Sequence, residues 1–326
     1  MLEILFVSLM IIVSLFVLVK GANYLVDGSA DLARLLRISP ILVGLTIVAF
    51  GTSLPEFIVS LFSVLAGNAD ISIGNIIGSN IANIALVIGI CAIITTLKVK
   101  SKTLIHEYPF MIISSFLLLI LANDWFIFGK NEFMLSRIDG IILLTLFVFF
   151  MYYVFNSMKK ARKSIKKEFS EEFQHQNPTW KNVLMIIGGI IALMIGGKLF
   201  IIYASELSLL AGLSDSFIGL VIAALGTSLP ELATSGIAAW KKQGDIAIGN
   251  IVGSNIFNIL FVLGTISLIK PIAVNPLLLQ IDAMIMLFVM GLFLVFSTYG
   301  KKIVRKNGII LVLIYILYIA FLIWRG

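Results

Sequence analysis

The chain has 326 residues, of which 60% are hydrophobic and 13% charged, with a formal net charge of +7 and a mean hydropathy of +1.09. A soluble domain carries about 25% charged residues, so this composition excludes an ordinary soluble protein and favours one that spans a membrane. The net positive charge does not indicate a nucleic-acid partner, because the basic residues are scattered over short segments between apolar runs.

Ten apolar runs are long enough to cross the hydrocarbon core of a bilayer, which takes about 20 residues. They cover residues 2–36, 40–66, 71–97, 104–122, 138–156, 181–211, 215–240, 245–269, 272–298 and 303–324. The first run carries Glu3 and lacks the basic start of a signal peptide, so we interpret it as one long tilted helix that is retained. The sequence therefore predicts an all-α integral membrane protein with ten transmembrane helices.

The basic residues predict the orientation of these helices. If the N-terminus lies outside, the inside segments hold the basic residues at positions 34–37, 98–102, 159–181, 241–242 and 301–306. The outside segments then hold only Lys130, Arg137, Lys270 and Arg325. An excess of Lys and Arg in cytoplasmic loops is the usual pattern, so we predict a multi-pass protein of the cell membrane with both termini extracellular.

A charged stretch divides the chain into two halves of five runs each. We predict a first five-helix repeat over residues 1–157, a basic cytoplasmic linker over 158–180 and a second repeat over 181–326. Because five is an odd number, the second half enters the membrane in the opposite sense to the first. Inverted repeats of this kind build substrate sites at their interface near the bilayer midplane.

One sequence block occurs in both halves, and a single constant offset relates all of its residues to their counterparts. The first copy is Gly-Thr-Ser-Leu-Pro-Glu at 51–56 followed by Gly-Asn-Ile-Ile-Gly-Ser-Asn-Ile-Ala-Asn at 74–83. The second is Gly-Thr-Ser-Leu-Pro-Glu at 226–231 followed by Gly-Asn-Ile-Val-Gly-Ser-Asn-Ile-Phe-Asn at 249–258. A carboxylate at the middle of a membrane helix costs about 2.5–3.5 kcal/mol, so its repetition indicates a function.

The residue types of the block point to a cation site. Pro55 and Pro230 each remove a helix hydrogen bond and free backbone carbonyls one turn earlier. Helical spacing places polar side chains of each copy on one face. The candidate ligands are Thr52, Ser53, Glu56, Ser79 and Asn83 in the first half and Thr227, Ser228, Glu231, Ser254 and Asn258 in the second. Ca²⁺ takes about 6–8 such hard oxygen ligands, and Na⁺ accepts similar ones.

Other residues have simpler interpretations. The asparagines outside the ligand set, Asn75, Asn80, Asn250 and Asn255, we expect to cap backbone and join helices. The pairs Gly74/Gly78 and Gly249/Gly253 are expected to pack helices closely. Cys91 is expected in the core, His106 and His175 have no metal-ligand spacing, and Asp27, Asp31 and Glu206 are expected at solvated helix ends. Lys20 and Lys198 are interpreted as snorkelling or as contacting lipid headgroups.

The paired blocks resemble the α-repeats of the sodium/calcium exchanger family, in the cation/calcium antiporter superfamily, and above all its compact prokaryotic and archaeal members. The resemblance implies ten helices and Ca²⁺ extrusion driven by Na⁺ entry. It implies that Glu56 and Glu231, with the carbonyls of Thr52 and Thr227, hold Ca²⁺. It assigns the Na⁺ sites to Ala49, Ser53, Ser79, Asn83, Ala224, Ser228, Ser254 and Asn258.

Asn258 argues against K⁺ co-transport, because potassium-dependent members of the family carry Asp at this position. Two alternatives stay open: exchange of H⁺ or another divalent cation, and a cation channel. We predict that the chain is not an enzyme, because it has no HExxH motif, phosphate loop or nucleophile–base pair. We expect no cofactor, no nucleic acid and no obligate protein partner, only the bilayer and the transported ions.

Overall fold

The computed structural model describes residues 2–101, 103–123, 133–165, 179–210 and 224–325. The first half contains α1 (Leu2–Leu36), α2 (Pro40–Val43), η1 (Gly44–Val48), α3 (Ala49–Thr52), α4 (Leu54–Leu65), α5 (Ala69–Ala82), η2 (Asn83–Ile88), α6 (Gly89–Ile94), η3 (Thr103–Glu107), α7 (Tyr108–Leu121) and α9 (Arg137–Ile165). The second half contains α10 (Thr179–Leu210), α12 (Ala224–Thr227), α13 (Leu229–Trp240), α14 (Gly244–Ile256), η5 (Phe257–Leu263), α15 (Gly264–Ile269), η6 (Leu278–Asp282), α16 (Ala283–Thr298), η7 (Tyr299–Lys301) and α17 (Arg305–Arg325).

The prediction of an all-α membrane protein is confirmed. In the described part of the chain, eight helices are long and apolar enough to cross a membrane. A ninth span is broken: Pro40–Thr52 and Leu54–Leu65 meet at an angle of 42°. The start of the run predicted at 215–240 lies outside the described residues, and its remainder forms α12 and α13.

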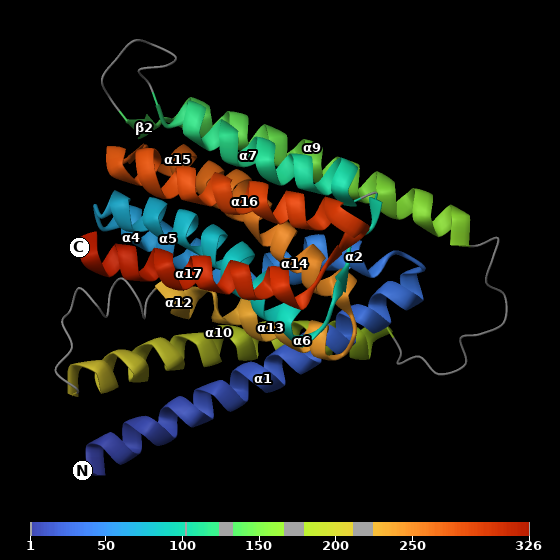
Figure 1. Cartoon of the computed structure of the whole chain (residues 1–326), viewed down its shortest axis with the longest axis horizontal. Helices are drawn as coiled ribbons and strands as arrows, with labels where there is room; N and C mark the ends of the chain where they lie inside the picture. Colours follow the sequence, from blue (N-terminus) through green and yellow to red (C-terminus); the bar gives the residue numbers. More distant parts are fainter. Residues whose placement is uncertain (1, 102, 124–132, 166–178, 211–223, 326) are drawn as a thin grey trace.

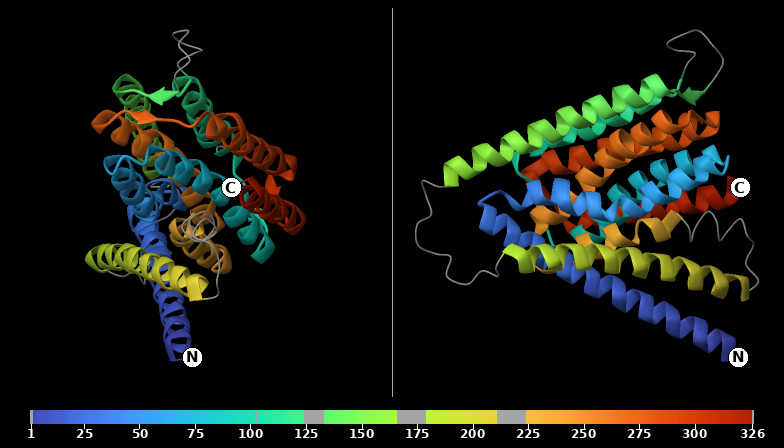
Figure 2. Two further views of the ribbon diagram at one scale, coloured as in Figure 1. Left: turned by 90° about the vertical axis from the view of Figure 1, so that its left-hand side faces the viewer. Right: turned by 180° about the vertical axis from the view of Figure 1, so that it is seen from behind.

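The helices form two groups (Figures 1 and 2). α1 and α10 run antiparallel beside each other along one side of the molecule, and the other helices pack together next to them. α1 and α10 are the first helices of the two halves, so their opposite directions agree with an inverted repeat. Both described ends of the chain lie at the same end of the molecule (Figure 1).

The predicted boundaries shift at several helix ends. α9 continues past residue 157 to Ile165, so the predicted linker begins within a helix. This extension is rich in Lys and Arg, which favour helix and need no membrane around them. The ninth run was predicted from 272, but residues 272–273 form strand β3, and the helix that continues into η6 begins only at residue 276. The domain division itself stays a prediction.

Short strands pair at the helix ends. β1 (Leu97–Lys98) is antiparallel to β4 (Lys302–Ile303), and β2 (Met134–Leu135) is antiparallel to β3 (Ile272–Ala273). The positions of β1 and β3 are related by the same offset as the two copies of the sequence block. Each pair joins one segment of the first half to one of the second, so the two halves are interleaved.

Close helix packing in the centre depends on glycine. A Cβ on Gly249 would lie 2.5 Å from the Ile41 carbonyl oxygen, and one on Gly253 would lie 2.7 Å from the Ala49 Cβ. The predicted packing role of this pair is confirmed. A Cβ on Gly74 or Gly78 would meet no described atom of another element within 4 Å. By the repeat, their expected partner is the segment equivalent to residues 41–44, namely 216–219, which lies outside the described residues.

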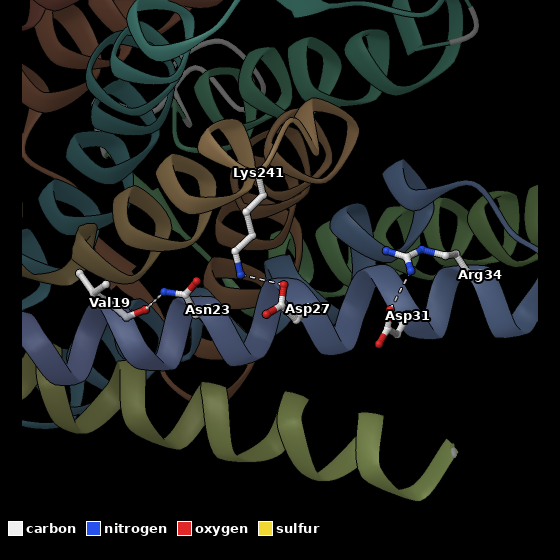
Figure 3. A network of polar contacts seen from close by, with 6 residues as sticks. All are labelled: Val19, Asn23, Asp27, Asp31, Arg34 and Lys241. Atoms are coloured by element: carbon white, nitrogen blue, oxygen red, sulfur yellow. Dashed lines mark hydrogen bonds and ion pairs between the residues drawn. The ribbon is translucent and has the colours of Figure 1, made fainter. Parts of the chain in front are cut away.

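An ion pair joins α1 to α13 (Figure 3). The Lys241 ammonium lies 2.7 Å from the Asp27 carboxylate, and their side chains are 29% and 49% exposed. Asp27 was expected to be simply solvated; sequence alone does not show that Lys241 ends a helix packed against α1. Asp31 pairs with Arg34 within α1 at 3.0 Å.

Candidate ion-binding site

Each sequence block breaks one helix and begins another. Ser53 and Ser228 have backbone angles of φ −83°, ψ 1° and φ −86°, ψ 1°, outside the helical range, and the new helices α4 and α13 start at the next residue. Pro55 and Pro230 stand in the first turn, where proline is tolerated because its missing N–H needs no partner. The predicted interruption of both helices is therefore confirmed.

The break positions both glutamates. Glu56 and Glu231 lie in the first turns of α4 and α13, where unpaired N–H groups and the helix dipole favour a negative charge. Both side chains are fully buried. Ser53, three residues before Glu56, donates to the Glu231 carboxylate at 3.4 Å, so the two copies of the block meet at this point. The structure thus brings together two carboxylates that belong to opposite halves of the chain.

The second helix of each block also departs from regular geometry. α5 passes into the π-helical segment η2 at Asn83, and α14 passes into η5 at Phe257, one residue before Asn258. Such wider turns occur frequently at functional sites, because they release backbone groups from the regular bonding ladder. The pattern of apolar residues does not reveal these wider turns, because it is the same in an α-helix that continues without a break.

The predicted ligand residues are almost all in the interior. The buried side chains are those of Ala49, Thr52, Ser53, Glu56, Ser79, Asn83, Thr227, Ser228, Glu231, Ser254 and Asn258. Ala224 begins α12, next to them in the chain, and its side chain lies outside the described part. The predicted set therefore forms an interior polar cluster, surrounded by the apolar residues of the core.

Hydrogen bonds across the two repeats hold this cluster. The Thr52 hydroxyl donates to the Asn250 amide oxygen at 3.0 Å and lies 3.3 Å from the Ser254 hydroxyl. The repeat-related bonds are also present. Thr227 donates to the Asn75 amide oxygen at 3.1 Å and lies 3.4 Å from the Ser79 hydroxyl. Each threonine thus contacts the helix of the other repeat.

The asparagines form a second mirrored set. The amide nitrogen of Asn83 donates to Asn255 at 3.0 Å, and that of Asn258 donates to Asn80 at 3.0 Å. The expectation that Asn80 and Asn255 join helices is confirmed. The amide nitrogens of Asn83 and Asn258 are used in this way, and their Oδ1 atoms accept no hydrogen bond from the described residues.

Two serines outside the predicted set accept hydrogen bonds from asparagines that contact the site threonines. Asn75 donates to Ser60 at 3.0 Å, and Asn250 donates to Ser235 at 3.0 Å. Ser60 and Ser235 are both buried. They are also related by the offset of the repeat, so extending the repeat comparison beyond the recognised block would have found them.

The two carboxylates differ in their surroundings. One oxygen of Glu231 accepts hydrogen bonds from Ser53 at 3.4 Å and from Ser254 at 3.3 Å. Neither oxygen of Glu56 has a hydrogen-bond donor among the described residues. The site is therefore symmetric in composition, but its bonding pattern is asymmetric.

Six buried oxygens of the cluster accept no hydrogen bond from the described part of the protein. They are both carboxylate oxygens of Glu56, Oε2 of Glu231, Oδ1 of Asn83, Oδ1 of Asn258 and Oγ of Ser228. A buried polar atom without a partner costs about 1–3 kcal/mol, and more when it is charged. A bound cation removes this cost. Oxygen ligands bind hard cations such as Na⁺ and Ca²⁺, whereas soft metals favour sulfur ligands.

Among the described residues, no group of three or more His, Cys, Asp or Glu side chains could hold a metal ion. Cys91 is a buried free thiol, as predicted. His106 faces the ring of Tyr153 at 5.6 Å, and His175 lies outside the described residues.

Broken helices from two inverted halves, with a cluster of buried oxygens where they meet, are the arrangement of a membrane transporter whose substrate site lies between its repeats. The sodium/calcium exchanger protein family model matches residues 6–156 and 181–324, nearly the whole chain in two parts. The chain therefore belongs to this family, whose members are transporters and not enzymes, and it is a multi-pass membrane protein.

Similar proteins agree with this assignment. The chain is 37% identical to the putative antiporter CaxA of Alkalimonas amylolytica, over 95% of this chain and 97% of the relative. It is 34% identical to the inner membrane protein YrbG of Escherichia coli (97% and 96% covered) and 29% to the sodium/calcium exchanger MaX1 of Methanosarcina acetivorans (96% and 97%). A solved structure of the sodium-calcium exchanger NCX_Mj superposes with a TM-score of 0.78 at 31% identity, covering 97% of this chain and 98% of that one.

Proposed function

We propose that this protein is an antiporter that exports Ca²⁺ in exchange for Na⁺ by alternating access. The observation that carries the proposal is the group of buried oxygens without donors, contributed by both repeats around Glu56 and Glu231. NCX_Mj, which has the same fold, has been soaked with Na⁺ and Ca²⁺ and with Na⁺ and Sr²⁺. Its similarity supports the same pair of ions here.

In this proposal Glu56 and Glu231 neutralise one Ca²⁺, and the carbonyls of Thr52 and Thr227 complete its shell. The Na⁺ ions use Ala49, Ser53, Ser79, Asn83, Ala224, Ser228, Ser254 and Asn258. Ca²⁺ bound together with the Na⁺ ions would bring more positive charge into the cluster than the two carboxylates compensate, so Ca²⁺ and Na⁺ bind in alternation. That competition couples the two fluxes.

Two carboxylates compensate at most two Na⁺ ions, so a third would carry a net positive charge through the membrane. Each charge moved gains about 2.3 kcal/mol per 100 mV. Exchange in this form is electrogenic, and an inside-negative potential drives Ca²⁺ out. The proposed location is the cell membrane, with both termini outside as the basic residues predict.

The second candidate is an exchanger driven by H⁺, because a pair of glutamates can also bind protons. It is disfavoured by the hydroxyl groups at Thr52, Ser53, Thr227 and Ser228, which suit Na⁺ and neither take up nor release protons at neutral pH. A channel is disfavoured because the site is enclosed between two inverted halves and surrounded by buried side chains.

The test is Ca²⁺ uptake into proteoliposomes loaded with Na⁺, with choline or a pH gradient as the alternatives. We expect uptake only with an outward Na⁺ gradient, and a rate that depends on an imposed potential. Flux driven fully by the pH gradient and indifferent to Na⁺ would establish the proton exchanger instead.

K⁺ dependence is tested in the same vesicles. Asn258 offers an amide dipole where a carboxylate would attract an additional cation, so we expect equal Na⁺-driven flux with and without K⁺. An absolute requirement for K⁺ would contradict this use of Asn258.

A further inference from the structure

A groove lies between the two long helices that stand beside the core. Its volume is about 380 Å³, and it is lined by residues of α1 and α10 only. Most of its lining is apolar or small, including Gly21, Gly188 and Ala192, but Lys20 and Lys181 also line it. The groove is separate from the oxygen cluster, and no residue of the ion site lines it.

The two lysines stand in surroundings that otherwise face lipid. On α1, Phe16 is 61% exposed beside Lys20, and on α10 Leu184 is 58% exposed beside Lys181. The Lys20 ammonium lies 5.5 Å from the centre of the Phe16 ring. Within the described residues neither lysine forms an ion pair. Charges at the edge of hydrocarbon are normally paired or solvated, so both ammonium groups are available to an anion that enters the groove.

The lysines are also spaced along the groove. Gly28 of α1 faces the carbonyl of Asn182, next to Lys181. Lys20 is two turns nearer the N-terminus of α1, a rise of about 12 Å. Lys181 therefore lies toward the predicted cytoplasmic end of the groove, and Lys20 lies deeper. The Lys20 side chain therefore has to extend toward the cytoplasmic end for both ammonium groups to reach one headgroup, as a lysine that snorkels does.

We propose that this groove binds one anionic phospholipid of the cytoplasmic leaflet, its phosphate held by Lys181 and Lys20 and its chains lying on the exposed apolar residues. Basic pockets between membrane helices on the cytoplasmic side are suited to anionic headgroups. A second copy of the chain would bring like charges together, so charge complementarity selects a lipid. Because the lipid contacts both α1 and α10, it binds the helix pair as a unit, whichever ion is transported.

The experiment uses Trp180, which is adjacent to Lys181 and 65% exposed. The other three tryptophans, Trp125, Trp240 and Trp324, are replaced by Phe in the full-length protein. Quenching of Trp180 by brominated phosphatidylglycerol is compared with quenching by brominated phosphatidylcholine in vesicles. We expect a preference for the anionic lipid, to which each lysine contributes roughly fivefold.

Matched variants separate a specific groove from general attraction. Lys20→Gln and Lys181→Gln should each reduce the preference, and the double variant should abolish it. Lys198→Gln, on the same helix but outside the groove, should leave it unchanged. Native mass spectrometry of the lipid retained by each purified variant gives a second readout that does not depend on Trp180.

Three results would overturn the proposal. The first is an equal affinity for both lipids in the unsubstituted protein, and the second is an equal loss in Lys198→Gln. The third is complete competition by inorganic phosphate at millimolar concentration, which would assign the lysines to a soluble anion.

Discussion

At the scale of single residues, Glu231 is held by two serine hydroxyls, and Glu56 by none that the structure describes. The repeated block predicted both carboxylates and eight polar residues that lie buried with them, because the repeat places identical residues at one offset. It could not predict this asymmetry, since identical blocks carry no information about which conformation the two halves adopt. The difference arises only once the halves pack.

Replacing either carboxylate should abolish Ca²⁺ transport. Glu56→Gln and Glu231→Gln keep the size of the side chain but remove one of the charges that neutralise Ca²⁺. Loss of one member of a buried charge pair costs about 3–5 kcal/mol, so Ca²⁺ affinity should fall at least about 100-fold. The measurement is calorimetric Ca²⁺ binding together with flux in proteoliposomes. Glu206→Gln, a carboxylate on α10 outside the cluster, is the control and should retain both. Full Ca²⁺ flux in either folded site variant would contradict the site.

The supporting hydrogen bonds should appear in stability. Asn250→Ala removes the acceptor of Thr52 and the donor to Ser235 in a fully buried position. Each orphaned group costs about 1–3 kcal/mol, so the thermal midpoint should fall by several degrees. Asn23→Ala removes a bond to the Val19 carbonyl on the exposed face of α1, and its midpoint should stay within about 1 °C. Equal midpoints for the two variants would show that the mirrored network does not stabilise the fold.

At the scale of elements, the apolar runs predicted most helices to within a few residues, because the membrane imposes their length. The runs gave no sign of the wider turns at Asn83 and Phe257, of the strand at 272–273 or of the extension of α9. These features depend on packing between the halves or on chain outside the bilayer. The hydropathy of a local segment contains no information about packing between the halves or about the chain outside the bilayer.

The Asp27–Lys241 ion pair belongs to this scale, because it ties α1 to the end of α13. Its repeat-related positions are Ile202 and Ala66, which cannot form an ion pair. Because the repeat-related positions cannot form this contact, we expect the pair to favour this arrangement over one in which the two halves exchange conformations. Partly exposed ion pairs contribute about 0.2–1 kcal/mol. Asp27→Asn should therefore shift the equilibrium between the two arrangements of the halves by up to about fivefold.

Hydrogen exchange measures this shift. We expect faster amide exchange in the last turn of α13 for Asp27→Asn and for Lys241→Gln, and restoration in the charge-reversed double variant. Asp31→Asn removes the contact with Arg34 within α1 and is expected to leave the last turn of α13 unchanged. If Asp31→Asn accelerated exchange as much as Asp27→Asn, the effect would be one of net charge and not of the contact.

At the scale of the whole molecule, the antiparallel course of α1 and α10 follows from a feature that is visible in sequence (Figure 2). Equivalent helices of the two copies are five spans apart, and because five is an odd number the second copy runs in the opposite direction. The side of the membrane on which each loop lies was predicted from basic residues alone. A structure without a bilayer gives the relative directions of the helices, and the absolute orientation stays a prediction.

Labelling of single engineered cysteines tests that orientation. Asn68 follows α4 and Lys242 follows α13, and both are exposed in the described structure. The two helices carry the same sequence block, so in a direct repeat both positions would face the same side. In the inverted repeat we expect a membrane-impermeant maleimide to label Asn68→Cys from outside intact cells, and to reach Lys242→Cys only after the membrane is opened. Cys91 is buried and should not react, and the Cys91→Ser background confirms that it contributes no signal. Labelling of both positions from outside would contradict the inverted repeat, whereas the opposite assignment of both would reverse the orientation predicted from the basic loops and leave the inverted repeat intact.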